Sequence, residues 1–349
     1  MTIFSMGYLR CSVGALIFLS FISLMLHLLL FWQLKPNQDH VRPQNLTILL
    51  WQWPFGVSYS LKGNVCWEMF SIPGCFLKDN QSMFSHADVV VFHHQELSNG
   101  CSMLPLHLPR PPRQRWIWLS LEPPLNNHNL SAFNGLFNWT MSYRSDADIF
   151  MPYGKLVAKK NTSTYFIPQK QNCLVAWVVS HYKDQQKRSK VYQQLRKHIP
   201  AELIEVYGHW TQRPLADKNL LSTISRCLFY LAFENSEHKD YITEKLWRNS
   251  LQAGSVPVVL GPPKSNYERL LPLDAFIHVD DFSSAKELAG FLQHLASDRK
   301  SYEAYFRWHD SHEVKTYTDW RERLCTICSN YHKLPMHKVY QDLYGWVNK

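Results

Sequence analysis

The sequence of 349 residues lacks internal repeats and low-complexity segments, which excludes repeat solenoids and long biased tracts as its main architecture. It also lacks the RNP, helix-turn-helix and zinc-finger patterns that accompany nucleic-acid binding. One Cys-x-x-Cys pair, Cys325 and Cys328, has the form of half a zinc site, but no second pair completes it. These absences leave a globular chain of one or two domains.

Composition and charge favour a large core and an anionic partner. Hydrophobic residues make up 46% of the chain, and 13 tryptophans and 17 tyrosines offer faces that can stack on sugars or bases. The formal net charge of +9 suits nucleic acid, anionic lipid or an anionic substrate. Because the basic residues are scattered and no nucleic-acid motif accompanies them, we expect no nucleic-acid partner. A basic surface without function is the plain alternative.

Residues 13–32 form an apolar run without a formal charge that is long enough to cross a bilayer. The residues that follow, including Phe31 and Trp32, do not suit signal-peptide cleavage, so we expect an uncleaved signal anchor. The surrounding charges barely decide its orientation, because Arg10 precedes the run and Lys35 and Arg42 follow it. The pattern predicts a cytoplasmic tail at 1–12, a transmembrane anchor at 13–32 and a stem at 33–45.

Glycosylation acceptors and cysteines both place the remainder of the chain in an oxidising lumen. Five Asn-x-Ser/Thr triplets follow the anchor, all before residue 165: Asn45, Asn80, Asn129, Asn138 and Asn161. Their clustering predicts a glycosylated face and a bare functional half. Seven cysteines also follow the anchor, so disulfides would leave one cysteine over.

Strand-like apolar runs alternate with helical patterns, which predicts an α/β fold with parallel sheets. The expected strands are 47–51, 88–92, 115–121, 148–151, 174–180, 203–207, 228–233, 256–260 and 275–279. The expected helices are 187–198, 241–253, 284–295 and 302–318. We therefore expect one α/β domain at 46–165, a second at 172–320, and a return of residues 321–349 to the first.

The stretch 228–263 has the pattern strand, polar loop, helix, strand. Tyr241, Glu244 and Lys245, at spacing i, i+3 and i+4, would share one side of the first helical turns, with Asp240 as N-cap. Ligands bind where parallel strands end and helices begin. An ammonium and a carboxylate at this place suit the phosphate and ribose of a nucleotide. A capped helix with a surface Glu and Lys is the alternative.

Two other strand ends carry candidate functional side chains. Glu122 follows the strand 115–121, where a carboxylate can serve as a general base, although a solvated loop glutamate has the same pattern. His93 and His94 directly follow the strand 88–92. Adjacent strand residues point to opposite faces and chelate poorly together, so we expect hydrogen bonding at a cleft rather than a metal site.

The segments Phe233-Glu234-Asn235-Ser236, 238–247 and 253–262 resemble the signature of the α-1,3-fucosyltransferases, glycosyltransferase family ten. The resemblance extends from about Thr47 to the C-terminus, and implies a GT-B fold in which two Rossmann-like domains face a cleft. It implies that the second domain binds the donor GDP-fucose, that Glu122 is the catalytic base, and that the first domain holds the acceptor. The implied donor-binding residues are Tyr143, Arg144, Arg188, Asn235, Tyr241, Glu244 and Lys245. The implied acceptor-side residues are Trp53, His93 and Gln95.

The resemblance also bears on metals and cofactors. Asp146-Ala147-Asp148 looks like the DxD metal motif of many glycosyltransferases, but the family carries a similar run and binds its donor without that metal. We therefore expect no metal site and no cofactor beyond the donor substrate. The two aspartates are expected to pair with Arg144 and cap the turn instead.

The family pattern implies that the terminal Cys-x-x-Cys is joined to the first domain. The implied disulfides connect Cys66 and Cys75 with Cys325 and Cys328. Cys173 with Cys227 is a further candidate pair, for which the family counterpart of Cys173 is displaced by three residues, to the position of Ala176. A local alternative joins Cys66 to Cys75 and Cys325 to Cys328. Cys101 is the candidate for the unpaired cysteine.

Three positions depart from the family: Pro123 replaces a serine, Gln95 a basic residue and His181 an asparagine. These departures leave substrate contacts at those positions open.

The implied activity is inverting transfer of L-fucose from GDP-fucose, in α-1,3 linkage, to N-acetylglucosamine of lactosamine glycans on glycoproteins and glycolipids. Within the family the chain is most similar to members that fucosylate sialylated lactosamine to give sialyl Lewis X, although the sequence leaves the choice between sialylated and neutral acceptors open. The implied location is the Golgi membrane, single-pass type II, with a lumenal catalytic part. The alternatives are a GT-B enzyme using another nucleotide sugar, and an inactive Golgi lectin or scaffold, which should have lost the charged site residues.

Overall fold

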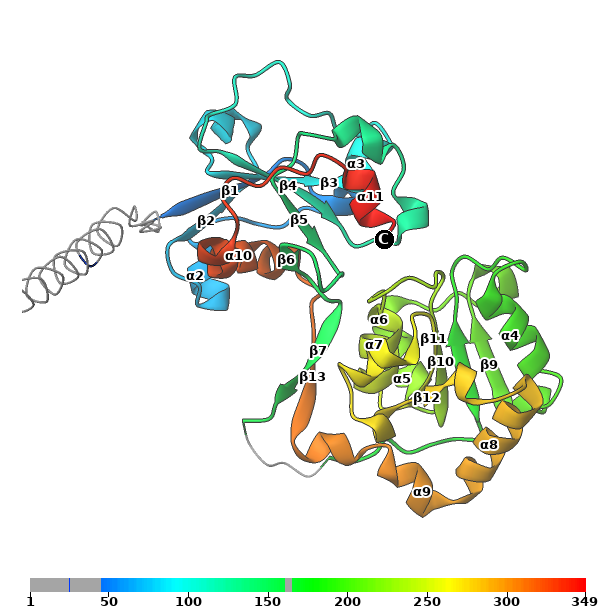
Figure 1. Cartoon of the computed structure of the whole chain (residues 1–349). Helices are drawn as coiled ribbons and strands as arrows, with labels where there is room; N and C mark the ends of the chain where they lie inside the picture. Colours follow the sequence, from blue (N-terminus) through cyan, green and yellow to red (C-terminus); the bar gives the residue numbers. More distant parts are fainter. Residues whose placement is uncertain (1–24, 26–44, 161–164) are drawn as a thin grey trace, which may run out of the picture. The chain divides into compact units, whose positions relative to one another are not determined.

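Two parallel β-sheets with helices on both faces organise the chain (Figure 1). The computed structural model describes residue 25, residues 45–160 and residues 165–349. Residues 44–349 belong to one compact unit. The α/β prediction is therefore confirmed. The predicted anchor at 13–32 lies outside the described residues except for residue 25, and the helices that are described include none long and apolar enough to cross a membrane.

The first sheet has the strand order β2-β1-β3-β4-β5-β6, and every neighbouring pair is parallel. Its strands are β1 (Leu46–Leu50), β2 (Cys75–Lys78), β3 (Val89–His93), β4 (Arg115–Ser120), β5 (Trp139–Ser142) and β6 (Ile149–Phe150). Ile48 and Val91 belong to one core and their neighbours Leu49 and Val90 to the other. The sheet is thus buried on both faces, as parallel sheets usually are.

Short helices cover this first sheet. They are α2 (Val65–Phe70), α3 (His94–Ser98), α10 (Trp320–Asn330) and α11 (Leu343–Val347). Leu324 of α10 packs in the core on one face and Leu343 of α11 in the core on the other. The C-terminal segment therefore supplies part of both cores of the first sheet.

The second sheet has the order β12-β11-β10-β8-β9 and is also parallel. Its strands are β8 (Val175–Val178), β9 (Ile204–Tyr207), β10 (Phe229–Phe233), β11 (Val256–Leu260) and β12 (Ile277–His278). Its helices are α4 (Lys187–Leu195), α5 (Asp217–Ile224), α6 (Glu244–Leu246), the π-helix η7 (Trp247–Gln252), α7 (Lys264–Glu268), α8 (Ala285–Ser297) and α9 (Arg299–Ala304). Helices α4 and α8 pack together in one core, whereas α5, η7 and α7 share the other.

A two-stranded antiparallel ribbon joins the two halves (Figure 1). The chain leaves the first sheet through β7 (Gly154–Ala158) and returns through β13 (His312–Thr316). The expected helix 302–318 is therefore wrong, because α9 ends at Ala304 and the following segment pairs with β7. This strand contains Val314 and Thr316, whose β-branched side chains suit extended backbone.

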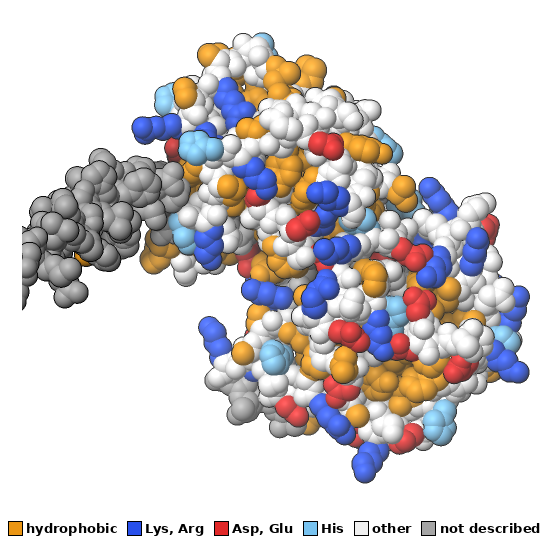
Figure 2. Space-filling model, in the orientation of Figure 1, with side chains coloured by type: hydrophobic (Ala, Val, Ile, Leu, Met, Phe, Trp, Pro, Cys, Tyr) orange, Lys and Arg blue, Asp and Glu red, His pale blue; other side chains and the backbone are white. Residues whose placement is uncertain are grey.

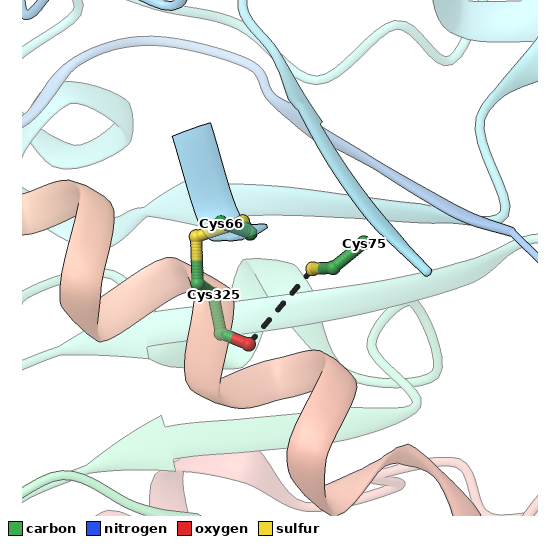
Figure 3. Close-up of side chains that lie close together, drawn as sticks. All are labelled: Cys66, Cys75 and Cys325. Atoms are coloured by element: carbon green, nitrogen blue, oxygen red, sulfur yellow. Dashed lines mark hydrogen bonds between the residues drawn. A yellow bond between two sulfur atoms is a disulfide. The ribbon is translucent and has the colours of Figure 1, made fainter. Parts of the chain in front are cut away.

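Two disulfides join helix α10 to the part of the chain that forms the first sheet. Cys66 of α2 is bonded to Cys325, and Cys75 of β2 to Cys328, both on α10. Figure 3 shows the first bridge, with the Cys75 sulfur 3.9 Å from the carbonyl oxygen of Cys325. The long-range pairing is confirmed and the local alternative is wrong. Because all of these sulfurs are in disulfides, their proximity does not create a thiolate metal site.

The second half carries its own bridge, between Cys173 and Cys227, which confirms this candidate pair although the family counterpart of Cys173 is displaced. Within the described part of the chain, Cys101 is unpaired and exposed.

The predicted glycosylation acceptors differ in exposure. Asn45, Asn80 and Asn129 are exposed, whereas Asn161 lies outside the described residues. Asn138 is only 7% exposed. Its Oδ1 accepts hydrogen bonds from the Trp116 amide and from Arg110, and its Nδ2 donates to a carbonyl oxygen. The structure thus favours glycosylation at the three exposed asparagines over Asn138.

Candidate donor and base site

A pocket of about 190 Å³ opens at the carboxyl edge of the second sheet, where β8, β10 and β11 end. Parallel α/β sheets bind ligands at this edge. Most of its lining comes from the ends of β10 and β11 and the start of α4, and one residue comes from a loop of the first half. The lining residues are Leu125, Gln186, Lys187, Arg188, Glu234, Asn235, Ser236, Glu237 and Leu260.

An ion cluster around Lys245 lies beside the pocket residue Glu234. The Lys245 Nζ lies 3.1 Å from Glu234 Oε2, 3.1 Å from Glu244 Oε1 and 2.8 Å from Thr243 Oγ1. Glu234 directly follows β10 and also accepts hydrogen bonds from the Thr243 amide, at 2.8 Å, and hydroxyl, at 2.9 Å. Thr243 is the N-cap of α6. One buried carboxylate thus fixes the helix start and the lysine together.

Burial and charge act in opposite directions in this cluster. Burial favours the neutral amine of Lys245, but the two carboxylates outweigh it and raise the pKa of this lysine. Burial raises the pKa of Glu234, and Lys245 offsets only part of that effect. For Glu244, burial is outweighed by the Lys245 ammonium, so its pKa is lowered. Lys245 is therefore a permanent cation near neutral pH.

The predicted helix start differs from the observed one. Asp240 is not the N-cap, because it has a positive φ of 63° and lies three residues before Thr243. Its carboxylate instead accepts hydrogen bonds from the Ser145 amide, Asn266 and Arg269. As the helix begins at Glu244, Tyr241 does not share a helical face with Glu244 and Lys245 as the spacing predicted.

Arg188 adds a second buried cation to the pocket wall. It lies in the first turn of α4 and is only 5% exposed. Its Nε donates to Gln186 Oε1 at 2.8 Å, and its NH2 group donates to the carbonyl oxygen of His181 at 2.5 Å. Burial lowers the pKa of Arg188, and the Glu234 charge opposes that shift. His181 itself is exposed and takes part through its backbone.

Two predicted donor residues have polar atoms in this region. Asn235 lines the pocket, and its buried Oδ1 has no hydrogen-bond partner among the residues that the structure describes. An unpaired buried acceptor of this kind is suited to a ligand donor. Tyr241 is buried against Tyr143, with ring centroids 5.0 Å apart.

Glu122 lies on the loop after β4 that also carries the pocket residue Leu125. Its side chain is half-buried, and Asn126 donates a hydrogen bond to Oε2 at 2.7 Å. Burial raises the pKa of Tyr241, and the charges of Glu234 and Glu122 raise it further. The Glu122 charge therefore acts on Tyr241, in the loop that precedes α6. The Tyr153 hydroxyl, bonded to the Leu121 carbonyl at 2.7 Å, supports the end of this strand.

The segment after β5 is held mainly by protein contacts. The Arg144 guanidinium is 3% exposed, bonded to Asp146 at 2.7 Å and to the carbonyl of Val347 at 3.1 Å, and lies over the ring of Trp346. Asp148 contacts Lys338 at 2.6 Å and Tyr340 at 2.8 Å. The expected pairing with Arg144 is thus right for Asp146 and wrong for Asp148.

Tyr143, another predicted donor residue, is buried beside the loop that precedes α6. Its hydroxyl is 3.0 Å from His238 Nδ1. Burial raises the pKa of this phenol, with Arg144 opposing the shift. Tyr143 therefore contacts His238, in the loop that precedes α6, and does not line the pocket described above.

The predicted acceptor-side residues lie at the carboxyl ends of β1 and β3. Trp53 is buried and donates to Asp79 at 2.9 Å, His93 is buried and bonded to Glu96, and Gln95 is half-buried. His94 was expected at a strand end but begins α3, where its Nδ1 accepts from Trp118. Burial lowers the pKa of His94 to about 4, so it is a neutral core histidine.

Two residues that the sequence did not single out belong with these sites. Glu234 is the buried anchor of Lys245, and its position inside the family motif was the available signal. Phe55 is 57% exposed, has a positive φ of 56°, and packs edge-on against His93. Its amide donates to Glu96 at 2.7 Å, which holds this unusual backbone in place. Its strained conformation had no signal in the sequence.

Acidic and basic side chains are interspersed over the face seen in Figure 2 rather than gathered into one basic stripe. Of the two cations assigned to the site, Arg188 is buried and the Lys245 side chain is 16% exposed.

Buried cations at the carboxyl edge of one parallel sheet, with a carboxylate on a loop of the other half, define a transferase that uses a phosphorylated donor. The chain matches the family models "Glycosyltransferase family 10 (fucosyltransferase) C-term" over residues 167–346 and "Fucosyltransferase, N-terminal" over residues 43–154. It therefore belongs to glycosyltransferase family 10 and is a fucosyltransferase. The family resemblance seen in the sequence is confirmed.

Several known proteins are similar to this chain. Alpha-(1,3)-fucosyltransferase 7 of Mus musculus is 48% identical, over 90% of this chain and 79% of its own length. The Homo sapiens protein of that name is 46% identical over 93% of each. A 4-galactosyl-N-acetylglucosaminide 3-alpha-L-fucosyltransferase 9 of Mus musculus is 43% identical over 86% of this chain and 81% of its own.

A solved alpha1,3-fucosyltransferase structure with GDP-fucose has a similar fold, with a TM-score of 0.55. It is 16% identical to this chain and covers 86% of this chain and 93% of its own.

Proposed function

We propose that this enzyme transfers L-fucose from GDP-fucose, with inversion and in α-1,3 linkage, to the N-acetylglucosamine of lactosamine glycans, sialylated ones included. The names of the relatives support the linkage and the family supports the sugar. The observation that carries the proposal is the loop of Glu122 and Leu125. It places Leu125 of the first half in the lining of the cationic pocket of the second, with Glu122 three residues before Leu125. We propose that the two halves form the GT-B arrangement around one site.

In the proposed reaction, Glu122 accepts the proton of the acceptor 3-hydroxyl. The acceptor oxygen bonds to the anomeric carbon of the β-linked fucose, and the bond from that carbon to the diphosphate oxygen breaks on the opposite face. GDP leaves with the electron pair, and the product is an α-linked fucoside. Lys245 and Arg188 stabilise the negative charge that develops on the diphosphate, without a metal. Asn235, Glu244 and Tyr241 hold the nucleotide.

An aromatic platform is proposed for the acceptor. Phe55, His93 and Trp320 form a cluster with ring centroids 5.1 to 6.4 Å apart. Phe55 follows β1 and His93 ends β3, and β3 lies between β1 and β4, the strand that precedes Glu122. The exposed ring of Phe55 can stack on the apolar face of a sugar.

Phe55→Ala is expected to raise the KM for the acceptor about tenfold, equivalent to about 1.4 kcal/mol. The KM for GDP-fucose should change by less than about twofold, because the donor pocket lies on the other sheet. Initial rates with each substrate varied in turn check this. A larger effect on the donor than on the acceptor would contradict an acceptor role.

The proposed location is the Golgi membrane, in single-pass type II orientation with a lumenal catalytic part. Three disulfides and three exposed glycosylation acceptors support an oxidising lumen. Endoglycosidase treatment should increase the mobility of the cellular protein, and the protein should co-localise with Golgi markers. A chain without glycans would count against the lumenal location.

The deciding experiment expresses the full chain in cells that lack α-1,3-fucosyltransferase activity. Their membranes are assayed with GDP-fucose on sialylated and on neutral lactosamine, and the product linkage is determined by NMR. We expect α-1,3-fucosylated product with at least the sialylated acceptor. Transfer from a different nucleotide sugar would favour another glycosyltransferase activity. Binding of GDP without any transfer would favour an inactive lectin or scaffold.

A further inference from the structure

The Lys245 ammonium has three N–H donors, and three protein acceptors lie within reach of it: Glu234, Glu244 and Thr243. An ammonium whose donors are all engaged has none left for an incoming diphosphate. If Lys245 contacts the donor, one of these three bonds must be given up.

The three partners differ in their freedom to move. The Glu234 side chain is 1% exposed and is held by the amide and hydroxyl of Thr243. Thr243 is itself buried as the N-cap of α6. The Glu244 side chain is 46% exposed and, besides Lys245, interacts with Thr243 and with its own backbone amide. Glu244 is therefore the partner that can leave without disturbing the core.

We propose that Glu234 is a positioning residue that keeps Lys245 at the pocket wall, while Glu244 is exchanged when the donor binds. This inference rests on the proposed function, because it takes GDP-fucose as the ligand. In the exchange, Glu244 releases Lys245 and accepts a hydroxyl of the nucleotide ribose, and Lys245 donates the freed N–H to the diphosphate. Glu234 remains bound to Lys245 and Thr243 throughout.

Two unpartnered groups agree with a site built to receive polar ligand atoms here. Asn235 Oδ1 and the Tyr267 hydroxyl are buried, and neither has a hydrogen-bond partner within the described residues. The Tyr267 hydroxyl is close to Glu234, since a Cβ added at Gly261 would lie 3.0 Å from that hydroxyl and 2.9 Å from Cγ of Glu234. Polar groups without a protein partner thus extend from Glu234 toward the end of β11.

The test is a comparison of Glu234→Gln with Glu244→Gln in the full chain. Glu234→Gln keeps the shape and the acceptor for Thr243 but removes the fixed charge beside Lys245. We expect kcat to fall on the order of 10²-fold, since a misplaced catalytic group has an effect of this size, and the Kd for GDP to rise as well, because Lys245 also contacts the diphosphate of GDP. Glu244→Gln should instead mainly raise the KM for GDP-fucose, with a smaller change in kcat.

Glu322→Gln is the matched control, because Glu322 also pairs with a lysine, Lys315, at 2.8 Å but lies on α10 away from the pocket. It should leave kcat and KM unchanged. Should Glu234→Gln not fold, Glu234→Asp, which keeps the charge and withdraws it by one methylene, is used in the same comparison. A normal kcat in the folded Glu234→Gln variant, or a loss of kcat in Glu244→Gln as large as in Glu234→Gln, would overturn the proposal. Wild-type chain without turnover on GDP-fucose would instead count against the proposed function.

Discussion

Glu122→Gln is expected to reduce fucose transfer about 10³-fold, within the range by which a positioned general base accelerates a reaction. The amide is isosteric and can still accept the hydrogen bond from Asn126, so the loop after β4 should keep its structure. It cannot, however, take the proton of the acceptor hydroxyl. Single-turnover rates at saturating donor and acceptor measure the loss directly.

Binding of GDP is the control for this variant, because Arg188, Asn235 and Lys245 lie in the second half and keep their contacts. Calorimetry should give a Kd for GDP within about twofold of the wild-type value. Turnover within about tenfold of the wild type would exclude Glu122 as the base. Another half-buried carboxylate near the acceptor would then have to be sought.

Removal of both bridges between α10 and the first half is expected to destabilise the protein by more than twice the effect of removing one. The bridges close nearly the same loop, with separations of 259 and 253 residues. With one bridge left, the other closes a ring of only about a dozen residues, and its loss should cost about 3 kcal/mol. Loss of both opens the long loop as well, for a total of roughly 8 kcal/mol, comparable to the whole stability of a domain.

Cys66→Ala/Cys325→Ala and Cys75→Ala/Cys328→Ala are the two single-bridge variants, and the quadruple variant removes both. Thermal unfolding and limited proteolysis compare them, and we expect the quadruple variant to accumulate poorly or not at all. Cys101→Ser is the neutral control, since this cysteine is exposed and unpaired in the described structure. Additive effects of the two single-bridge variants would contradict a shared loop.

Local hydrophobic patterns predicted most strands, because a buried parallel strand is an apolar run that needs no distant information. The stretch 256–260 coincides with β11, and 229–233 lies within the expected strand. The ribbon was missed for the opposite reason. β13 is polar and half-exposed, and becomes a strand only because β7, more than 150 residues earlier, pairs with it.

The site shows the same division. The spacing of Tyr241, Glu244 and Lys245 placed charged groups near a helix start, but the start itself was predicted wrongly at Asp240. That residue satisfies its carboxylate with Ser145 and Arg269, which are distant in sequence. The sequence predicted no separate role for Glu234 within the family motif, because no local pattern reveals that Thr243 and Lys245 bond to its carboxylate. The disulfide pairing came from family resemblance, since the cysteine spacing alone allowed a local solution.

The use of residues 320–349 on both faces of the first sheet has a consequence for synthesis. A ribosome completes every strand of the second sheet before it makes α10 and α11, which the first sheet needs to close its two cores. The nascent first half must therefore wait, with apolar surface uncovered, while the second half is translated and folds. Chaperones and disulfide isomerases have that interval in which to act, and a chain released early by a late stop codon should fail quality control even though all of its donor-site residues are present.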